Sequence, residues 1–286
     1  MLNITLLPED VLLEILSLVP PLDLIRRCRL VCRQWRDVID SSTLWKMICQ
    51  KMGHIPKDWK HQPKDWKKYY YLSNRRRNLL KNTCANEGFK FWKLEKNEGH
   101  HWKVEDLPGE HGQQHPDDTV TKYFVTSFEK CLKSQLIDLR KMGYSKELMD
   151  SDQPDIVIRD WFAARADCGC QYEIKVHLLS EDKKVLCKFS PELVFIPQWS
   201  DAHWQEMSHT FRDYGPGVRY IYFSHGGKDT QWWAGWYGVR VTNTSVTIEP
   251  EDLTVQSVTP HTIKCHGVKK QNQKGKSKKR ACKPCM

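Results

Sequence analysis

Residues 225–238, with the sequence HGGKDTQWWAGWYG, are the most unusual stretch of this 286-residue chain. Four aromatic residues, Trp232, Trp233, Trp236 and Tyr237, fall within six positions and are surrounded by glycines. Glycine marks turns and permits close backbone approach, so we expect a loop. Its aromatic side chains either pack at the rim of a core or contact a ligand. We expect Trp236, which directly precedes a strand-like run, to be a core residue, whereas the pattern leaves Trp232 and Trp233 open between the two roles.

The runs on either side of this loop have the pattern of β-strands. Residues 218–223 alternate with a period of two, and residues 239–242 and 246–248 are rich in β-branched side chains, which predicts a long hairpin loop. Further strand-like runs lie at residues 88–94, 101–104, 122–125, 134–139, 156–162, 171–179, 185–189 and 204–211. Many short strands with one short helix at 144–149 predict an antiparallel sandwich or barrel over residues 88–252.

Residues 1–50 have a different, helical pattern. Pro8 stands where a helix would begin, and apolar residues at helical spacing follow it up to the pair Pro20-Pro21. Asp23 is the expected N-cap of a second helix, and Leu44 begins a third segment. So short a unit is marginal as a free domain, so it is either an ordinary bundle or offers an apolar face to a partner.

The two remaining segments are basic. Residues 51–87 interleave cations with aromatics, a pattern that can bind single-stranded nucleic acid, but we expect a helical linker with aromatics on one face. Residues 253–286 form a basic tail that we expect to be disordered. Residues 264–286 alone contribute +9 of the net charge of +10, so the body of the chain is close to neutral and nucleic acid is not the expected partner.

Catalytic and metal-binding patterns are weak. Cys168 and Cys170 stand close together, as do Cys282 and Cys285, but neither pair has the second short-spaced pair of a zinc site. No phosphate-binding glycine loop occurs, and the apolar run near the N-terminus is interrupted by acidic residues. We therefore expect a soluble, intracellular binding protein that has no cofactor and is not an enzyme.

The helical unit resembles an F-box. The resemblance rests on the runs LLPEDVLLEIL at 6–16, LVCRQWR at 30–36 and LW at 44–45, which stand at the usual spacing. It implies a module at residues 1–50 that binds the Skp-type linker of a cullin-based ubiquitin ligase. The implied linker-binding residues are Leu7, Pro8, Val11, Leu12, Ile15 and Leu16.

The β domain resembles the F-box-associated domain of the sugar-recognising F-box proteins. The matching segments are DWF at 160–162, DCGCQYE at 167–173, SHTFRDYGPGVR at 208–219 and residues 226–243. The resemblance implies that residues 88–252 fold as an antiparallel, jelly-roll-like β-sandwich. It also implies a cytoplasmic adaptor that binds the chitobiose core of high-mannose glycans on misfolded glycoproteins. The implied sugar contacts are Arg165, Ala166, Asp167, Trp232 and Trp233. A β domain that recognises protein substrates without their glycans is the alternative.

Overall fold

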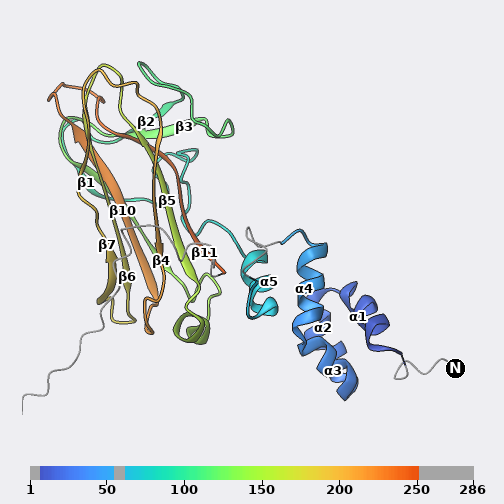
Figure 1. Cartoon of the computed structure of the whole chain (residues 1–286). Coiled ribbons are helices and arrows are strands. Elements are labelled where there is room, and N and C mark those ends of the chain that lie inside the picture. Colours follow the sequence, from blue (N-terminus) through green and yellow to red (C-terminus); the bar gives the residue numbers. More distant parts are fainter. Residues whose placement is uncertain (1–6, 55–61, 251–286) are drawn as a thin grey trace, which may run out of the picture.

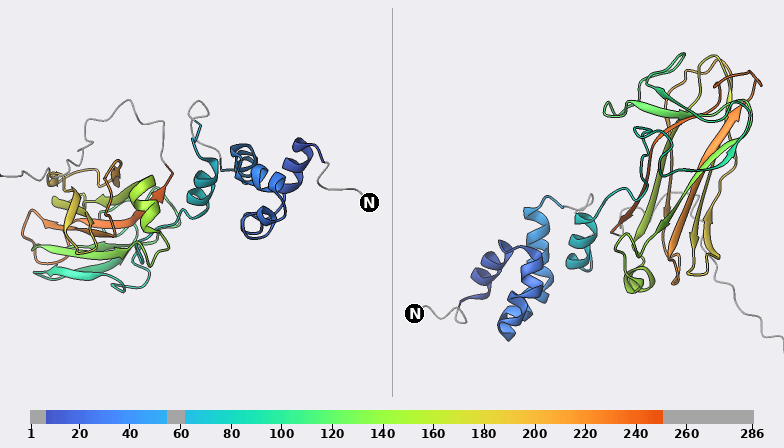
Figure 2. Two further views of the ribbon diagram at one scale, coloured as in Figure 1. Left: turned by 90° about the horizontal axis from the view of Figure 1, so that it is seen from below. Right: turned by 180° about the vertical axis from the view of Figure 1, so that it is seen from behind.

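The computed structural model describes residues 7–54 and 62–250, which form a helical unit and a β-sandwich (Figure 1). The predicted basic tail over 253–286 lies outside these residues. The helical unit and the sandwich stand apart, with one helix between them (Figure 2). Within the described ranges, no helix is both long and apolar enough to cross a bilayer.

The helical unit consists of short segments that end at prolines and polar caps. They are α1 (Glu9–Ser17), α2 (Pro21–Arg26), the 3₁₀ turn η2 (Cys28–Leu30), α3 (Arg33–Asp40) and α4 (Ser42–Lys51). The expectation that Asp23 caps α2 is wrong, because Pro21 begins the helix and Asp23 lies in its first turn. Proline has a fixed φ that suits the first helical position, so Pro20 ends one connection and Pro21 starts the next helix. Ser41 caps α4 by accepting a hydrogen bond from the Leu44 N–H at 3.4 Å.

Helix α5 (Trp66–Asn74) contributes to two separate cores. Trp66 and Tyr70 pack with Trp45 in the helical unit, while Leu72 packs in the core of the sandwich. Lys68 adds an ion pair with Asp152 of the β domain at 3.0 Å. The helix predicted within the segment 51–87 is therefore a structural joint between the two domains.

The β domain is a sandwich of two antiparallel sheets. One sheet has the order β1-β4-β10-β6-β7, with β8 also paired to β6, and the other has the order β2-β3-β11-β5-β9. The strands are β1 (Lys93–Asn97), β2 (Lys103–Asp106), β3 (Lys122–Val125), β4 (Cys131–Asp138), β5 (Asp155–Ala163), β6 (Cys170–Leu179), β7 (Val185–Phe189), β8 (Val194–Ile196), β9 (Gln205–Phe211), β10 (Tyr220–Asp229) and β11 (Arg240–Glu249). The predicted antiparallel sandwich is confirmed. The short helix expected near 144–149 is a π-helical turn, η3 (Leu148–Asp152).

The predicted hairpin around residues 225–238 is wrong. Strand β10 lies in one sheet and β11 in the other, so residues 230–239 cross between the sheets. The first glycines of the stretch belong to β10, where a Cβ on Gly227 would lie 1.8 Å from the Gln171 carbonyl oxygen of β6. Glycine is needed there because the strands approach closely, which the sequence pattern alone cannot distinguish from a turn.

The sandwich core contains a buried polar network that joins the two sheets. Asp160 of β5 accepts hydrogen bonds from Tyr172 Oη, His225 Nδ1 and Thr244 Oγ1, each at 2.6 Å. His225 Nε2 in turn lies 2.5 Å from the Nζ of Lys133, which is fully buried over the ring of Trp92. Burial lowers the pKa of His225 to about 4, so the ring is neutral at physiological pH.

Candidate functional site

The loop at residues 230–239, called the tryptophan loop below, is fixed by an aspartate at the end of β10. Asp229 Oδ1 accepts hydrogen bonds from the backbone N–H groups of Gln231 at 3.0 Å and Trp232 at 2.7 Å. These bonds hold Trp232 at a φ of +58°, a left-handed conformation that is uncommon outside glycine. Burial raises the pKa of Asp229, and the backbone donors oppose that shift. The turn therefore presents Trp232 in one defined backbone conformation.

The two tryptophans of the loop are exposed, although their side chains are large and apolar. Trp232 is 63% exposed and Trp233 is 39% exposed. Lys228 Nζ lies 4.4 Å from the centre of the Trp232 ring, a cation–π distance. Neither side chain is therefore a buried core residue, and both present aromatic surface at the end of the loop.

Trp233 is connected to the turn at Arg165 through an aromatic residue between them. The Trp233 and Tyr237 rings meet edge to face, with centroids 5.5 Å apart. The guanidinium of Arg165 stacks on the Tyr237 ring at 4.6 Å. The structure thus links two predicted site elements that are far apart in the sequence, and the linking residue, Tyr237, was not among the predicted contacts.

The turn at residues 165–168, called the arginine turn below, is held by ion pairs. Arg165 Nε and Nη2 donate to the two carboxylate oxygens of Asp167 at 2.9 and 3.0 Å, and Glu110 lies 3.3 Å away. This bidentate pair lowers the pKa of Asp167. The backbone N–H of Ala166 donates to the His111 carbonyl at 2.9 Å. Arg165 is buried, so its position suits it to hold Asp167 and Tyr237 in place.

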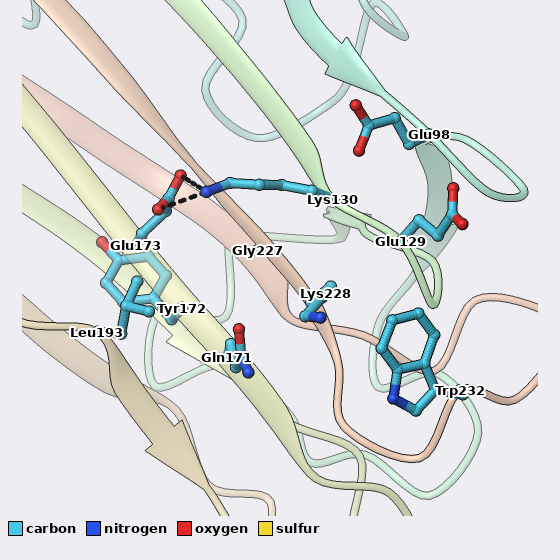
Figure 3. Close-up of a pocket in the computed structure, with 10 residues that line it drawn as sticks. All are labelled: Glu98, Glu129, Lys130, Gln171, Tyr172, Glu173, Leu193, Gly227, Lys228 and Trp232. Atoms are coloured by element: carbon cyan, nitrogen blue, oxygen red, sulfur yellow. Dashed lines mark hydrogen bonds and ion pairs between the residues drawn. The ribbon is translucent and has the colours of Figure 1, made fainter.

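A cavity of about 390 Å³ opens beside Trp232 on the outer surface of the six-stranded sheet (Figure 3). It lies among the residue after β1, the two residues before β4, strands β6 and β10, the residue before β8, and the tryptophan loop. Its walls are Glu98, Glu129, Lys130, Gln171, Tyr172, Glu173, Leu193, Gly227, Lys228 and Trp232. Of the five predicted sugar contacts, only Trp232 borders this cavity.

Trp236 has a different environment from its two neighbours. It is half-buried and packs on a small apolar cluster that includes Tyr123 and Trp204. Its Nε1 donates to the His100 carbonyl at 3.1 Å, and Lys103 Nζ lies 4.3 Å from its ring. Trp236 therefore lies at the rim of a core and not inside it, although its place before a strand predicted a core position.

The predicted linker-binding residues of α1 divide into two groups. Leu12 and Leu16 are fully buried in the helical core, whereas Val11 and Ile15 are 41% and 40% exposed. Pro8 is also exposed, and Leu7 is half-buried. Further exposed apolar residues come from neighbouring segments, and the sequence reasoning did not select them: Leu18, Leu22, Leu30 and Val31.

The two neighbouring cysteines of the β domain, Cys168 and Cys170, do not have the environment of nucleophiles. Cys168 and Cys170 are buried free thiols, and burial raises the pKa of Cys168 to about 12. Over residues 7–54 and 62–250, no group of three or more potential metal ligands is assembled. Cys282 and Cys285 lie outside those residues.

Four residues of the site were missed by sequence reasoning. These are Tyr237, which joins the two predicted elements, Asp229, which holds the loop, and Gln171 and Lys228 of the cavity. In an Asx turn, an Asp side chain accepts hydrogen bonds from backbone N–H groups two or three residues further along the chain. The role of Asp229 could therefore have been predicted from its position before the loop. No sequence pattern predicts the roles of Gln171 and Lys228, because these two residues are brought together only by the pairing of β6 with β10.

Comparison with protein families gives two matches. Residues 70–248 match the F-box associated region, and residues 4–51 match an F-box-like domain. F-box only protein 6 of Bos taurus is 57% identical over 248 residues, which cover 87% of this chain and 94% of that protein. F-box only protein 44 of Homo sapiens is 55% identical, and the match covers 87% of this chain and 97% of that protein.

Solved structures give a weaker likeness. The structure of TmCBM61 in complex with beta-1,4-galactotriose covers 60% of this chain and 99% of its own, with 14% identity and a TM-score of 0.38.

Proposed function

The chain belongs to the F-box proteins that carry an F-box-associated domain, and from this premise we propose that it captures N-glycosylated proteins by their sugar. Members of this family are non-catalytic substrate adaptors of SCF ubiquitin ligases, so the F-box pairs this chain with a Skp-type linker and a cullin. In our proposal the ligand is the chitobiose core of high-mannose glycans. Its carriers are misfolded glycoproteins in the cytoplasm that are directed to ER-associated degradation.

The observation that carries the proposal is the exposure of Trp232 and Trp233 on a loop fixed by Asp229 and Tyr237. A sugar ring has an apolar C–H face and a rim of hydroxyls, so it needs an aromatic plane with polar groups beside it. The tryptophans supply the planes. Asp167, held ionised by Arg165, supplies an acceptor at the arginine turn.

The position of the loop in the fold suits an adaptor. Strand β11 begins at the tryptophan loop and ends at Glu249, which pairs with Arg76 after α5 at 3.1 Å. Ten residues of strand span roughly 33 Å, so the loop lies at the end of the sandwich away from the helical unit (Figure 1). A glycoprotein held there is kept clear of the helices that we propose bind the linker. Catalysis then works by proximity, because capture raises the effective concentration of substrate lysines near the charged enzyme.

Competition with free sugar tests the proposal. We expect the full chain to pull down a high-mannose glycoprotein, and free chitobiose to compete in a dose-dependent manner. The matched control is the same glycoprotein after enzymatic removal of its whole glycan, which should not be captured. Capture that persists after deglycosylation would contradict sugar recognition and favour a protein-binding β domain.

The exposed part of α1 gives a second prediction, on the ligase side. Ile15→Asp should lower affinity for the Skp-type linker at least about tenfold, because it places a charge in an apolar interface while leaving the core intact. A titration of linker with the full chain measures the change. Leu186→Asp is the matched control, since Leu186 is an equally exposed apolar residue on the β domain. Equal affinities of the two variants would exclude this face as the interface.

A further inference from the structure

We propose that the outer face of the six-stranded sheet is a docking surface for acidic polypeptide segments that also carry apolar side chains. This surface, called the aromatic face below, is formed by side chains of four strands that point away from the core: Leu136, His177, Val185, Lys188, Tyr220 and Tyr222. It is separate from the proposed sugar site, since the part of β10 from Tyr222 to Asp229 spans roughly 23 Å at the rise of a strand. A substrate can therefore be held by its polypeptide as well as by its glycan.

The centre of the aromatic face is a row of side chains in register across four strands. Leu136 of β4 and His177 of β6 both pair with Tyr222 of β10, and Lys188 of β7 pairs with His177. The residues before and after Tyr222 are fully buried in the core, so the Tyr222 side chain points outward. The centroids of the Tyr222 and His177 rings are 5.8 Å apart. Leu136 is 48% exposed, so the row presents apolar and aromatic surface to the solvent.

A second row extends this surface toward the turn between β6 and β7. Tyr220 and Val185 both pair with Leu179, which faces the same side of β6 as His177 two residues earlier. Val185 is 52% exposed, and Tyr220 is half-buried. Neighbouring exposed apolar side chains with a polar rim are typical of a contact with another protein.

Lysines surround the two rows and give the face a positive potential. Lys183 Nζ lies 6.0 Å from the centre of the Tyr220 ring, and Lys175 and Lys188 flank His177. Burial lowers the pKa of His177, and these two ammonium groups lower it further. The imidazole is therefore neutral at physiological pH, and the charge of the face comes from its lysines.

The acids near the aromatic face do not neutralise these lysines. Lys175 lies 3.8 Å from Glu173, but it shares that carboxylate with Lys130 at 3.0 Å. Three further acids are paired with lysines outside the two rows, in the pairs Glu95–Lys93, Asp138–Lys141 and Glu181–Lys146.

The lysines of the turn and of β7 carry the excess charge. Within the part of the chain that the structure describes, Lys183, Lys184 and Lys188 are exposed and have no ion pair. The acid beside them in the turn, Asp182, has none either, so three unpaired cations stand against one unpaired carboxylate. A surface with this excess of positive charge complements an acidic partner.

An acidic polypeptide fits the aromatic face better than a nucleic acid does. Bases bind by stacking on exposed ring faces, whereas the rings of Tyr222 and His177 pack on each other with a tilt of 34°. Leu136 and Val185 are aliphatic, which suits the apolar side chains of a polypeptide. Such side chains can contact the two rows while neighbouring carboxylates meet the lysines. A glycoprotein held at this face and at the tryptophan loop would gain avidity from the second contact.

Binding of a designed peptide to the full chain tests the docking surface. The probe is a fluorescein-labelled peptide in which glutamate and tyrosine alternate, and fluorescence anisotropy measures its affinity. We expect binding that weakens as salt is raised, because the lysines are exposed. The double variant Lys183→Glu, Lys188→Glu should weaken binding about tenfold, since two attractive contacts become repulsive. Leu136→Ser should weaken binding about threefold, because an exposed apolar side chain loses its contact with the peptide.

The matched control reverses two lysines of the basic tail, Lys278→Glu and Lys279→Glu, and should leave the affinity nearly unchanged. An equal loss in this control would overturn the docking surface, and so would unchanged affinity in both face variants or no binding by the native chain. Displacement by free chitobiose would place the peptide at the tryptophan loop instead. Displacement by a single-stranded oligonucleotide, with equal binding of a glutamate–serine peptide, would show recognition by charge alone, and either displacement contradicts the proposal. Because the probe carries no sugar, failure of chitobiose binding would leave a positive result intact.

Discussion

Replacement of Trp233 by alanine is expected to abolish capture of high-mannose glycoproteins. The side chain is exposed, so its removal takes away an aromatic plane and the edge contact with Tyr237, with little loss of core packing. Exposed aromatic anchors of this kind contribute about 2–4 kcal/mol to binding, which corresponds to at least about a 30-fold loss of affinity. Quantitative pull-down of a high-mannose glycoprotein, together with titration of chitobiose, measures the loss.

Several variants make this result specific. Trp233→Phe keeps an aromatic plane and should retain most of the affinity. Phe91→Ala removes an exposed aromatic residue of the segment before β1, outside the cavity, and should leave capture unchanged. Linker binding should be the same in all three variants, because the helical unit is separate from the loop. Full glycoprotein capture by Trp233→Ala would show that the tryptophan loop is not the sugar platform.

Replacement of Asp160 by alanine is expected to destabilise the β domain by about 3–5 kcal/mol. The carboxylate is fully buried and accepts hydrogen bonds from Tyr172, His225 and Thr244, so its loss leaves three buried donors without an acceptor. It also removes the charge that favours the protonated form of Lys133, whose pKa burial lowers well below the ordinary value. Urea unfolding, followed by near-ultraviolet circular dichroism of the full chain, measures the change.

The control for this prediction is an aspartate of the same domain that lies at the surface. Asp118 is exposed, so Asp118→Ala should change the free energy of unfolding by less than about 0.5 kcal/mol. The helical unit can unfold as a separate transition, and Asp160→Ala should leave that transition in place. A native-like unfolding midpoint for the β domain of Asp160→Ala would contradict the view that this network joins the sheets.

Much of the fold could be predicted because the strands and helices follow local patterns of apolar and polar residues. The period-two runs at 122–125, 156–162, 171–179 and 185–189 became β3, β5, β6 and β7 with nearly the same bounds. The predicted strand before the tryptophan loop, by contrast, continues through Asp229. Glycine-rich backbone is compatible with both a turn and a closely paired strand, and only the neighbours at Cys131 and Gln171 decide between them.

The candidate site was predicted only in its outline. Trp232 and Trp233 stand out because aromatic residues between glycines are unusual at any position in a chain. Tyr237 was visible in the same stretch, but its contact with Arg165 depends on the approach of two loops that are far apart in sequence. Val11 and Leu12 are both apolar residues of the same predicted helix. In the packed helical unit, however, Val11 is exposed and Leu12 is fully buried.

The sequence by itself determined the two domains and their helical and antiparallel β patterns, and it singled out Trp232 and Trp233, since each of these depends on the periodicity or composition of a short segment. Only the tertiary structure decided that residues 230–239 cross between sheets, that Tyr237 connects Trp233 to Arg165, and that Gln171, Glu173 and Lys228 meet beside Trp232. Strand pairing and loop approach are set by long-range packing, and short-range periodicity carries no information about which strand becomes the neighbour. The cavity is made entirely of such neighbours, which is why it is invisible in the sequence.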